Sequence, residues 1–174
     1  MKSSMRFSRP TVLIALILVA ALSQSKTVYA ANVGAVVDVV LIPAGDFKAK
    51  TDDVKGTATL AGDTVKAENI IVPLKGLNSG IKLRDDHTKK KYLEIEKFPD
   101  AVLVKAEGKG GNGKGRIRIR NIEKDIAGTY KVEGSHLTAE FPLKLSDFGI
   151  VGIKYMGVGV DDNVKIHVTV PLKK

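Results

Sequence analysis

Residues 137–145 read LTAEFPLKL, and apolar side chains stand at every second position of this stretch. Successive side chains of a β-strand point to opposite faces, so this pattern predicts a strand with one apolar and one mostly polar face. The stretch VKIHVTV at 164–170 alternates in the same way. Because these two segments carry the clearest periodicity in the chain, they favour an all-β fold.

Extending the alternation along the chain predicts about eight strands, separated by turns rich in Gly, Asn and Asp. Most of the connections are short, which indicates antiparallel hairpins. Two connections are longer, at 76–100 and 147–161. The first has a helix-compatible composition from Leu83 to Tyr92, and Pro99 ends it before the next strand. The predicted strands lie near 34–42, 47–52 running into 53–61, 64–74, 101–107, 115–121, 124–133, 136–146 and 162–171.

Strands with one apolar face need a second apolar surface, which either a sandwich or a closed barrel provides. An eight-stranded barrel has room for packed side chains or for one apolar ligand. Several residues expected to face inward are small, and this favours a cavity, although small residues can also accommodate large neighbours in a solid core. These residues are Gly56, Ala58, Ala106, Gly128 and Ala139.

The N-terminus has the features of a secretory signal peptide. A basic start precedes the apolar run TVLIALILVAAL at 11–22, and Val28-Tyr29-Ala30 fits a cleavage site after Ala30. We therefore expect residues 1–30 to be removed and residues 31–174 to form one domain. Four of the 28 basic residues and none of the 19 acidic residues lie in the first thirty, which lowers the net charge from +9 to +5. The chain contains no cysteine.

Two basic features invite a nucleotide or nucleic-acid interpretation. The glycine-rich stretch at 108–115 has Gly115 where a P-loop needs Ser or Thr, and a strand follows where a P-loop needs a helix, so a hairpin loop is predicted. Arg116, Arg118 and Arg120 form a basic row with no aromatic platform beside it. A solvated outer strand face, without nucleic-acid binding, is the better interpretation.

The residues do not suggest an enzyme. The three histidines, His87, His136 and His167, are scattered, so no metal site is predicted. No serine stands in a recognisable nucleophile motif, and no catalytic residues or cofactor are predicted.

The 76–100 connection and several other segments together resemble the YceI family of exported lipid-binding proteins. The family shows a Gly-x-x-x-Arg-Asp-x-His core, then an aromatic or hydrophobic pair and a Tyr/Phe-Pro before a strand. One departure is residues 121–124, where many members have a Gly-Val/Ile-Thr turn. The matching residues are Gly80, Arg84, Asp85, His87, Tyr92-Leu93 and Phe98-Pro99, followed in order by segments within 44–56, 113–124, 145–150 and 160–164.

The resemblance implies a lipocalin-like, eight-stranded antiparallel barrel whose channel holds a polyisoprenoid or another long amphiphile. It also implies a periplasmic location, often a homodimer, and no enzymatic activity. The expected function is to bind a polyisoprenoid, an isoprenoid quinone or a fatty-acyl amphiphile for carriage, storage or scavenging. The alternative is a structural or stress-response envelope protein with no essential ligand.

The expected ligand site comprises the channel lining and its mouth. Arg84 and His87 could meet an anionic or quinone head group, or Arg84 could anchor its segment by pairing with Asp85 or a backbone carbonyl. Lys89 to Lys91 could favour transient contact with an anionic membrane. The predicted site residues are Phe47, Arg84, His87, Tyr92, Phe98, Val104, Tyr130, Phe141, Phe148, Ile150, Tyr155, Ile166 and Val168.

Overall fold

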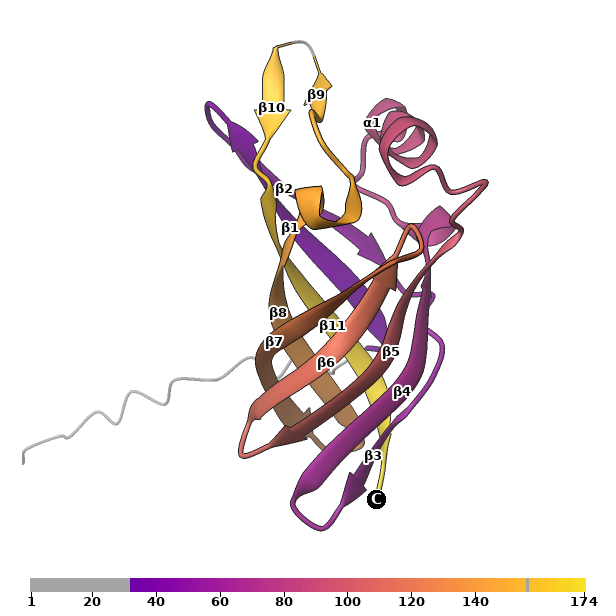
Figure 1. Cartoon of the computed structure of the whole chain (residues 1–174), viewed down its shortest axis with the longest axis vertical. Coiled ribbons are helices and arrows are strands. Elements are labelled where there is room, and N and C mark those ends of the chain that lie inside the picture. The colour runs from indigo at the N-terminus through magenta and orange to yellow at the C-terminus, as the bar shows by residue number, and fades with distance from the viewer. Residues whose placement is uncertain (1–31, 156) are drawn as a thin grey trace, which may run out of the picture.

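The computed structural model describes residues 32–155 and 157–174, with the exception of the Tyr155 side chain (Figure 1). The predicted signal peptide, residues 1–30, lies outside the described residues. Within them the chain forms eleven strands, which run along a tall barrel. They are β1 (Gly34–Ile42), β2 (Asp46–Thr51), β3 (Ala58–Ala61), β4 (Thr64–Pro73), β5 (Asp100–Lys109), β6 (Asn112–Ile119), β7 (Ile122–Glu133), β8 (His136–Lys144), β9 (Lys154–Tyr155), β10 (Val158–Val160) and β11 (Asn163–Lys173).

The wall is a closed ring of seven strands, in the order β3-β4-β5-β6-β7-β8-β11. Neighbours in the ring are antiparallel except at the seam, where β11 pairs with β3 in parallel through Leu172 with Ala58 and Lys173 with Thr59. Further along, β11 pairs with β1, and β1 pairs with β2. The prediction of an all-β, mostly antiparallel barrel is confirmed, but the closed ring has seven strands where eight were expected, because β1 and β2 continue the sheet from β11 outside the ring. The total of eleven strands exceeds the predicted eight because residues 47–61 form two strands and because β9 and β10 are additional.

The segment from 47 to 61 was expected to run from one strand into the next. It is interrupted between Thr51 and Ala58 because Gly56 adopts a φ of +117°, which is left-handed backbone that favours glycine. A Cβ on Gly56 would lie 2.6 Å from Ile70 Cδ1 and 3.2 Å from the Asn69 carbonyl oxygen. The close approach of this segment to β4 therefore requires glycine at position 56. The chain bends in this segment, between the end of β2 and the start of β3.

A β-bulge in β5 changes which side chains face inward. Leu103 pairs with Ile117 and Lys105 pairs with Arg116, so Val104 is an extra residue with no partner on β6. Opposite the bulge on β4, Asn69 has a φ of 53°. Because the bulge shifts the alternation by one position, Leu103 and Ala106 face the same side of the wall.

The two long connections lie at one end of the barrel, called here the upper end, and Figure 1 shows α1 and the β9–β10 hairpin there. The predicted helical segment is confirmed as α1 (Lys82–His87), which continues as the π-helix η2 (Thr88–Leu93). Two single turns complete the elements: η1 (Leu74–Gly76) and η3 (Leu145–Phe148). The lower end carries the β3–β4 hairpin and the end of β11.

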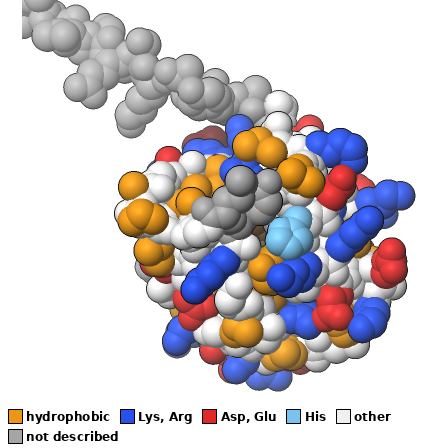
Figure 2. Space-filling view, turned by 90° about the horizontal axis from the view of Figure 1, so that it is seen from above, with side chains coloured by type: hydrophobic (Ala, Val, Ile, Leu, Met, Phe, Trp, Pro, Cys, Tyr) orange, Lys and Arg blue, Asp and Glu red, His pale blue; other side chains and the backbone are white. Residues whose placement is uncertain are grey.

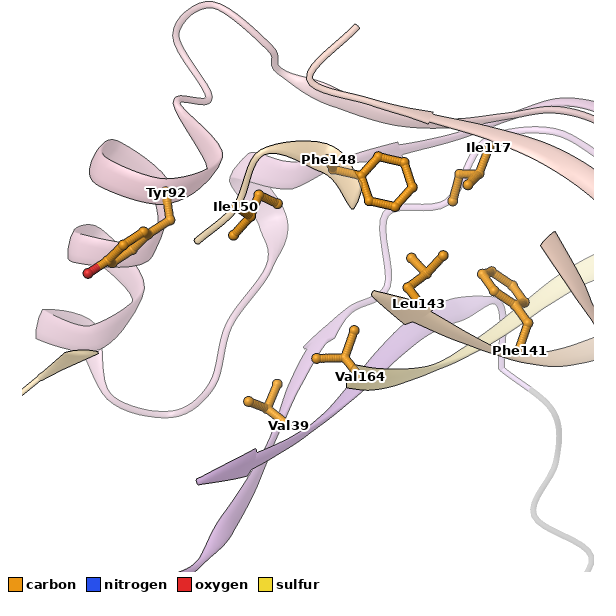
Figure 3. Packing of buried hydrophobic residues seen from close by; sticks show 8 residues of the cluster. All are labelled: Val39, Tyr92, Ile117, Phe141, Leu143, Phe148, Ile150 and Val164. Carbon is orange, nitrogen blue, oxygen red and sulfur yellow. The ribbon is translucent and has the colours of Figure 1, made fainter. Parts of the chain in front are cut away.

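Two clusters of buried apolar residues divide the interior. The upper cluster joins the wall to both connections, and Figure 3 shows Tyr92 and Ile150 on the side of the connections and Phe141 on the side of the strands. The lower cluster lies where the seam closes. The upper cluster is Val39, Tyr92, Ile117, Phe141, Leu143, Phe148, Ile150 and Val164, and the lower cluster is Ala58, Val65, Ala67, Ile70, Leu137, Val170 and Leu172.

Candidate ligand-binding cavity

The barrel encloses a cavity of about 280 Å³, which extends from the lower strands to the segment between β4 and β5. Its wall is overwhelmingly apolar and comes from the inward faces of the ring strands together with β1 and β2. This is the alternation that the sequence predicts, with the polar positions of each strand turned outward. A cavity of this kind offers an apolar environment to a ligand and little polar chemistry.

Several wall residues that face the cavity are only half-buried. Val37, Ile126, Ile166 and Val168 all line the cavity, yet none belongs to the fully buried core. In a solid core such residues would be covered by side chains from the opposite wall. Their accessible surface faces the cavity, so the protein does not fill its own interior.

In the lower part of the cavity, glycines in the wall allow close contacts between neighbouring strands and the Tyr130 ring. Gly108 faces the ring of Tyr130 so closely that a Cβ on Gly108 would lie 2.5 Å from Tyr130 Cε1. A Cβ on Gly115 would similarly meet Ala106 Cβ at 2.9 Å. These glycines bring the β5–β6 wall against the Tyr130 ring. At the seam, the buried side chains of Ala58, Val170 and Leu172 pack in the lower cluster, and Val170 also lines the cavity.

Polar side chains enter the wall at the upper end, on the segment that carries α1. The Arg84 side chain donates from Nε to Ser79 Oγ at 2.8 Å and from Nη2 to the Ser79 carbonyl at 2.9 Å. Its guanidinium carbon lies 3.7 Å from the centre of the Phe47 ring, a cation–π contact. Asp85 accepts hydrogen bonds from the Ser79 backbone N–H and hydroxyl. Arg84 therefore anchors its segment through Ser79 while it lines the cavity.

Tyr92 joins the two long connections. Its ring is buried in the upper cluster and lines the cavity. Its hydroxyl donates to the Gly152 carbonyl at 3.4 Å and accepts from the Lys154 backbone N–H at 3.3 Å. The π-helical turn that holds Tyr92 is thus tied to the segment before β9.

A second link between the connections runs through Arg120, at the turn between β6 and β7. Arg120 donates from Nη1 to the Gly149 carbonyl at 2.6 Å and forms an ion pair with Glu94. Lys97 and Arg120 lower the pKa of the Glu94 carboxyl below its usual range. In the second connection, hydrogen bonds from Ser146 lower the pKa of Asp162.

Eight of the predicted site residues line the cavity, and they come from distant parts of the chain. The structure brings together Phe47, Arg84, Tyr92, Tyr130, Phe141, Ile150, Ile166 and Val168.

Four predicted residues do not line the cavity. The bulge in β5 takes Val104 off the inward face. Phe148 is only 1% exposed and belongs to the solid part of the upper cluster. Phe98 lies beneath Arg120, whose guanidinium carbon is 5.8 Å from the ring centre. The His87 ring lies 5.4 Å from the Tyr92 ring, outside the wall. The Tyr155 side chain lies outside the described part of the structure.

Sequence reasoning missed much of the lining, although its own signal contained most of it. The alternation that identified Ile166 and Phe141 as lining residues applies to every second residue of a strand. Applied along whole strands, it would have predicted most of the missed residues. The bulge made Leu103 unpredictable, because only the pairing of β5 with β6 reveals the change of face. The main omissions are Val37, Val39, Ala67, Leu103, Ile117, Ile126, Leu143 and Val164.

The outer face carries ion pairs. Arg116 pairs with Asp125 and Arg118 pairs with Glu123, which agrees with the solvated face expected for the arginine row. Arg120 departs from that expectation, because it turns toward the connections. The glycine-rich stretch forms the predicted β5–β6 hairpin, with positive φ angles at Gly110 and Gly111.

His167 lies on the outer face of β11 between two carboxylates. Its Nε2 is 3.0 Å from an Asp38 oxygen and its Nδ1 is 3.3 Å from a Glu140 oxygen. Within residues 32–155 and 157–174 no group of three or more His, Cys, Asp or Glu side chains is arranged to hold a metal ion. The helices in this same part of the chain are all too short or too polar to cross a membrane.

Comparison with protein families gives a match over most of the chain. The family model for the YceI-like domain matches residues 27–172. A search of curated proteins found no match.

Solved structures share the fold at low sequence identity. BcnA of Burkholderia cenocepacia is 14% identical, with a TM-score of 0.59 over 78% of this chain and 96% of that protein. A polyisoprenoid-binding domain from Saccharophagus degradans, implicated in plant cell wall breakdown, is 8% identical, with a TM-score of 0.56 over 80% of this chain and 92% of that domain. The Campylobacter jejuni YceI protein is 15% identical, with a TM-score of 0.54 over 75% and 87% of the two chains.

Proposed function

This chain belongs to the YceI-like domain family, and from that premise we propose that it binds a long apolar molecule inside its barrel. The ligand classes that fit are a polyisoprenoid, an isoprenoid quinone and a fatty-acyl amphiphile. The protein would carry, store or scavenge this molecule and would not transform it chemically. The name of the Saccharophagus degradans domain supports the polyisoprenoid class.

The observation that carries the proposal is the unfilled apolar interior. Half-buried wall residues such as Ile166 and Val168 retain accessible surface that only a guest can cover. A protein selected for stability alone would gain by filling this space, since each buried CH₂ contributes about 0.8 kcal/mol. The same arithmetic gives a sixteen-carbon chain roughly 12 kcal/mol of gross burial free energy before the costs of association.

Burial alone selects poorly between one apolar chain and another, so selectivity must come from the length of the cavity and from its polar end. Arg84 and Lys89 are the cationic residues of that end, and Arg84 is the one held by hydrogen bonds. Its Nε and Nη2 hold Ser79, while its Nη1 makes no hydrogen bond with the residues the structure describes. We propose that Nη1 meets an oxygen of the ligand head group, and that this contact adds to the anchoring role of the same side chain.

The site of action proposed is the periplasm, reached with the predicted signal peptide. Expression of the full chain followed by intact-mass measurement tests this directly. The expected product begins at Ala31, and a product that retains residues 1–30 would contradict export by cleavage.

The function itself is tested on the purified protein by organic extraction and mass spectrometry, followed by titration with a polyisoprenoid and a fatty acid. A matched pair of variants controls for the location of the site. Val168 lies in the middle of the cavity wall, whereas Val132 is 41% exposed on β7. Val168→Phe fills the cavity, and Val132→Phe makes the same chemical change outside it.

We expect the wild type and Val132→Phe to bind one apolar molecule per protein and Val168→Phe to lose at least about tenfold in affinity, since a filled cavity cannot take the same chain. Circular dichroism checks that both variants are folded. If no apolar molecule is extracted and none binds on titration, the structural or stress-response function replaces the proposal.

A further inference from the structure

Exposed apolar side chains gather at the upper end of the barrel. Among the described residues, the large hydrophobic side chains with high exposure belong to this end, with the exception of Val132 on the lower part of β7. Ile81 is 54% exposed, Leu83 is 62% exposed and Val151 is 64% exposed. Val40, Ile42, Ile122 and Val158 complete the group. Such a concentration at one end is what a docking surface needs.

Basic side chains lie among these apolar residues. The segment of α1 and η2 contains five basic residues and two acidic ones. Both acidic residues already have partners, because Asp85 binds Ser79 and Asp86 pairs with Lys82 at 2.7 Å. Lys90 and Lys91 are exposed, and so is Lys154 on β9. Figure 2, which looks onto this end, shows blue basic side chains and orange apolar side chains on the same face.

The same segment forms the end wall of the cavity. Arg84, Thr88 and Leu93 line the cavity, while Ile81 and Leu83 at the start of the segment face solvent. A surface that carries apolar side chains among lysines therefore lies directly over the polar end of the cavity. Charge complementarity favours an anionic partner, and the exposed aliphatic side chains favour one with an apolar interior beneath its charge.

We propose that the upper end docks on an anionic phospholipid bilayer, with Ile81, Leu83 and Val151 in the headgroup region and Lys90 and Lys91 near lipid phosphates. This inference rests on the proposed function, because it names the surface from which the cavity exchanges its ligand. Docking in this orientation points the polar end of the cavity at the bilayer. A long apolar chain would then pass between membrane and barrel with little exposure to water.

The test is flotation with phosphatidylcholine vesicles, with and without phosphatidylglycerol, at low and high salt. The Lys90→Glu/Lys91→Glu double variant is compared with Lys66→Glu/Lys131→Glu, which makes the same charge change on exposed positions of the barrel wall. The Ile81→Ser/Leu83→Ser double variant tests the apolar part. None of these side chains lines the cavity.

We expect the wild type and Lys66→Glu/Lys131→Glu to float with phosphatidylglycerol vesicles and to detach at high salt. The Lys90→Glu/Lys91→Glu variant should lose about tenfold or more in partitioning, because each lysine at the surface adds about fivefold. Ile81→Ser/Leu83→Ser should also bind about tenfold less. Since the chain contains no Trp, Leu83→Trp provides a single tryptophan, which can be excited selectively over the four tyrosines. Its emission should shift to the blue on binding, whereas that of Val132→Trp should not respond.

Absence of flotation at low salt, or equal losses in the two charge variants, would overturn docking. A dimer in sedimentation that Ile81→Ser/Leu83→Ser converts to a monomer, without vesicle binding, would assign the surface to a second copy instead. The ligand content of each preparation is measured in parallel. A protein that holds an apolar molecule in its cavity but does not float with vesicles contradicts only the docking. A protein that floats with vesicles but never holds an apolar molecule in its cavity contradicts only the proposed function.

Discussion

The two long connections of the upper end are held to the barrel in different ways. Residues 145–162 are anchored by apolar burial, because Phe148 is 1% exposed and Ile150 is 4% exposed. Residues 74–99 bury Tyr92, but α1 itself has no buried residue and depends on the hydrogen bonds of Ser79 with Arg84 and Asp85.

This difference indicates which connection opens more readily. Truncating a buried aromatic side chain costs about 3–5 kcal/mol, whereas a hydrogen bond to a charged group contributes about 1.5–3 kcal/mol. The free energy needed to detach α1, which has no buried side chain, should therefore be smaller than that needed to detach η3. Since the α1 segment also forms the end wall of the cavity, the weaker connection is the one through which a ligand can enter.

The largest expected effect is that of Phe148→Ala. Removing this buried ring should lower the free energy of unfolding by about 3–5 kcal/mol, because the surrounding cluster cannot collapse onto the space. Urea unfolding of the ligand-free protein measures the loss. Val151→Ala, at a side chain that is 64% exposed, should change it by less than about 0.5 kcal/mol. Equal losses would show that the second connection is not anchored by burial.

Next in size is Asp85→Ala, which removes the acceptor of the Ser79 backbone N–H and hydroxyl. Hydrogen bonds to charged groups contribute about 1.5–3 kcal/mol, so the α1 segment should detach more easily by that amount. Hydrogen exchange should accelerate in residues 79–93 and stay unchanged in β6 to β8. The control is Asp86→Ala, which loses only the exposed pair with Lys82. Uniform acceleration along the chain would contradict local anchoring.

A smaller effect is expected for Tyr92→Phe, which removes the hydroxyl that links the two connections and keeps the buried ring. Its hydrogen bonds to Gly152 and Lys154 are long, so the loss should lie near about 0.5 kcal/mol, at the low end of the usual range. Thermal unfolding and hydrogen exchange near residue 152 measure it. Tyr130→Phe is the control, because no described residue forms a hydrogen bond with the Tyr130 hydroxyl. If Tyr130→Phe lowered the stability more than Tyr92→Phe does, the Tyr92 hydroxyl would not be the link between the two connections.

The smallest effect concerns pH. The pKa values of Glu94 and Asp162 are lowered in the folded protein, by Lys97 and Arg120 and by Ser146 respectively. A lowered pKa contributes stability above the unfolded value, about 4 for these groups, and this stability is lost as the pH falls through the folded pKa. Both connections should therefore lose protection from hydrogen exchange below about pH 4, before the barrel unfolds. Glu94→Gln should weaken this pH dependence in residues 74–99, and an unchanged profile would contradict the assignment.

The sequence predicted the wall better than the end of the cavity. Alternation alone places Phe141, Ile166 and Val168 on the inner face, because a strand leaves only two directions for a side chain. It misplaces Val104, because a bulge changes the face without changing the composition of the strand. Phe148 fits the apolar pattern but packs into the solid cluster, since its position depends on the η3 turn.

The contacts that hold the upper end were only partly predictable. The anchoring of Arg84 to a backbone carbonyl was among the expected alternatives, and Ser79 provides that carbonyl. The bonds of Tyr92 with Gly152 and Lys154 join residues about sixty positions apart. Such contacts depend on the closed barrel, which brings both connections to one end, and no local pattern encodes them.

The parallel pairing of β11 with β3 has a consequence for self-association. An exposed strand edge offers unpaired backbone groups to another chain, and closing the ring hides those of β3 and β11. The seam rests on only two residue pairs, Leu172 with Ala58 and Lys173 with Thr59. Fraying of these few residues would expose the edge of β3 to a neighbouring molecule. Fraying at the seam would therefore add a second free strand edge to that of β2, whose outer edge carries, among the described residues, only the isolated pairing of Lys50 with Asn78.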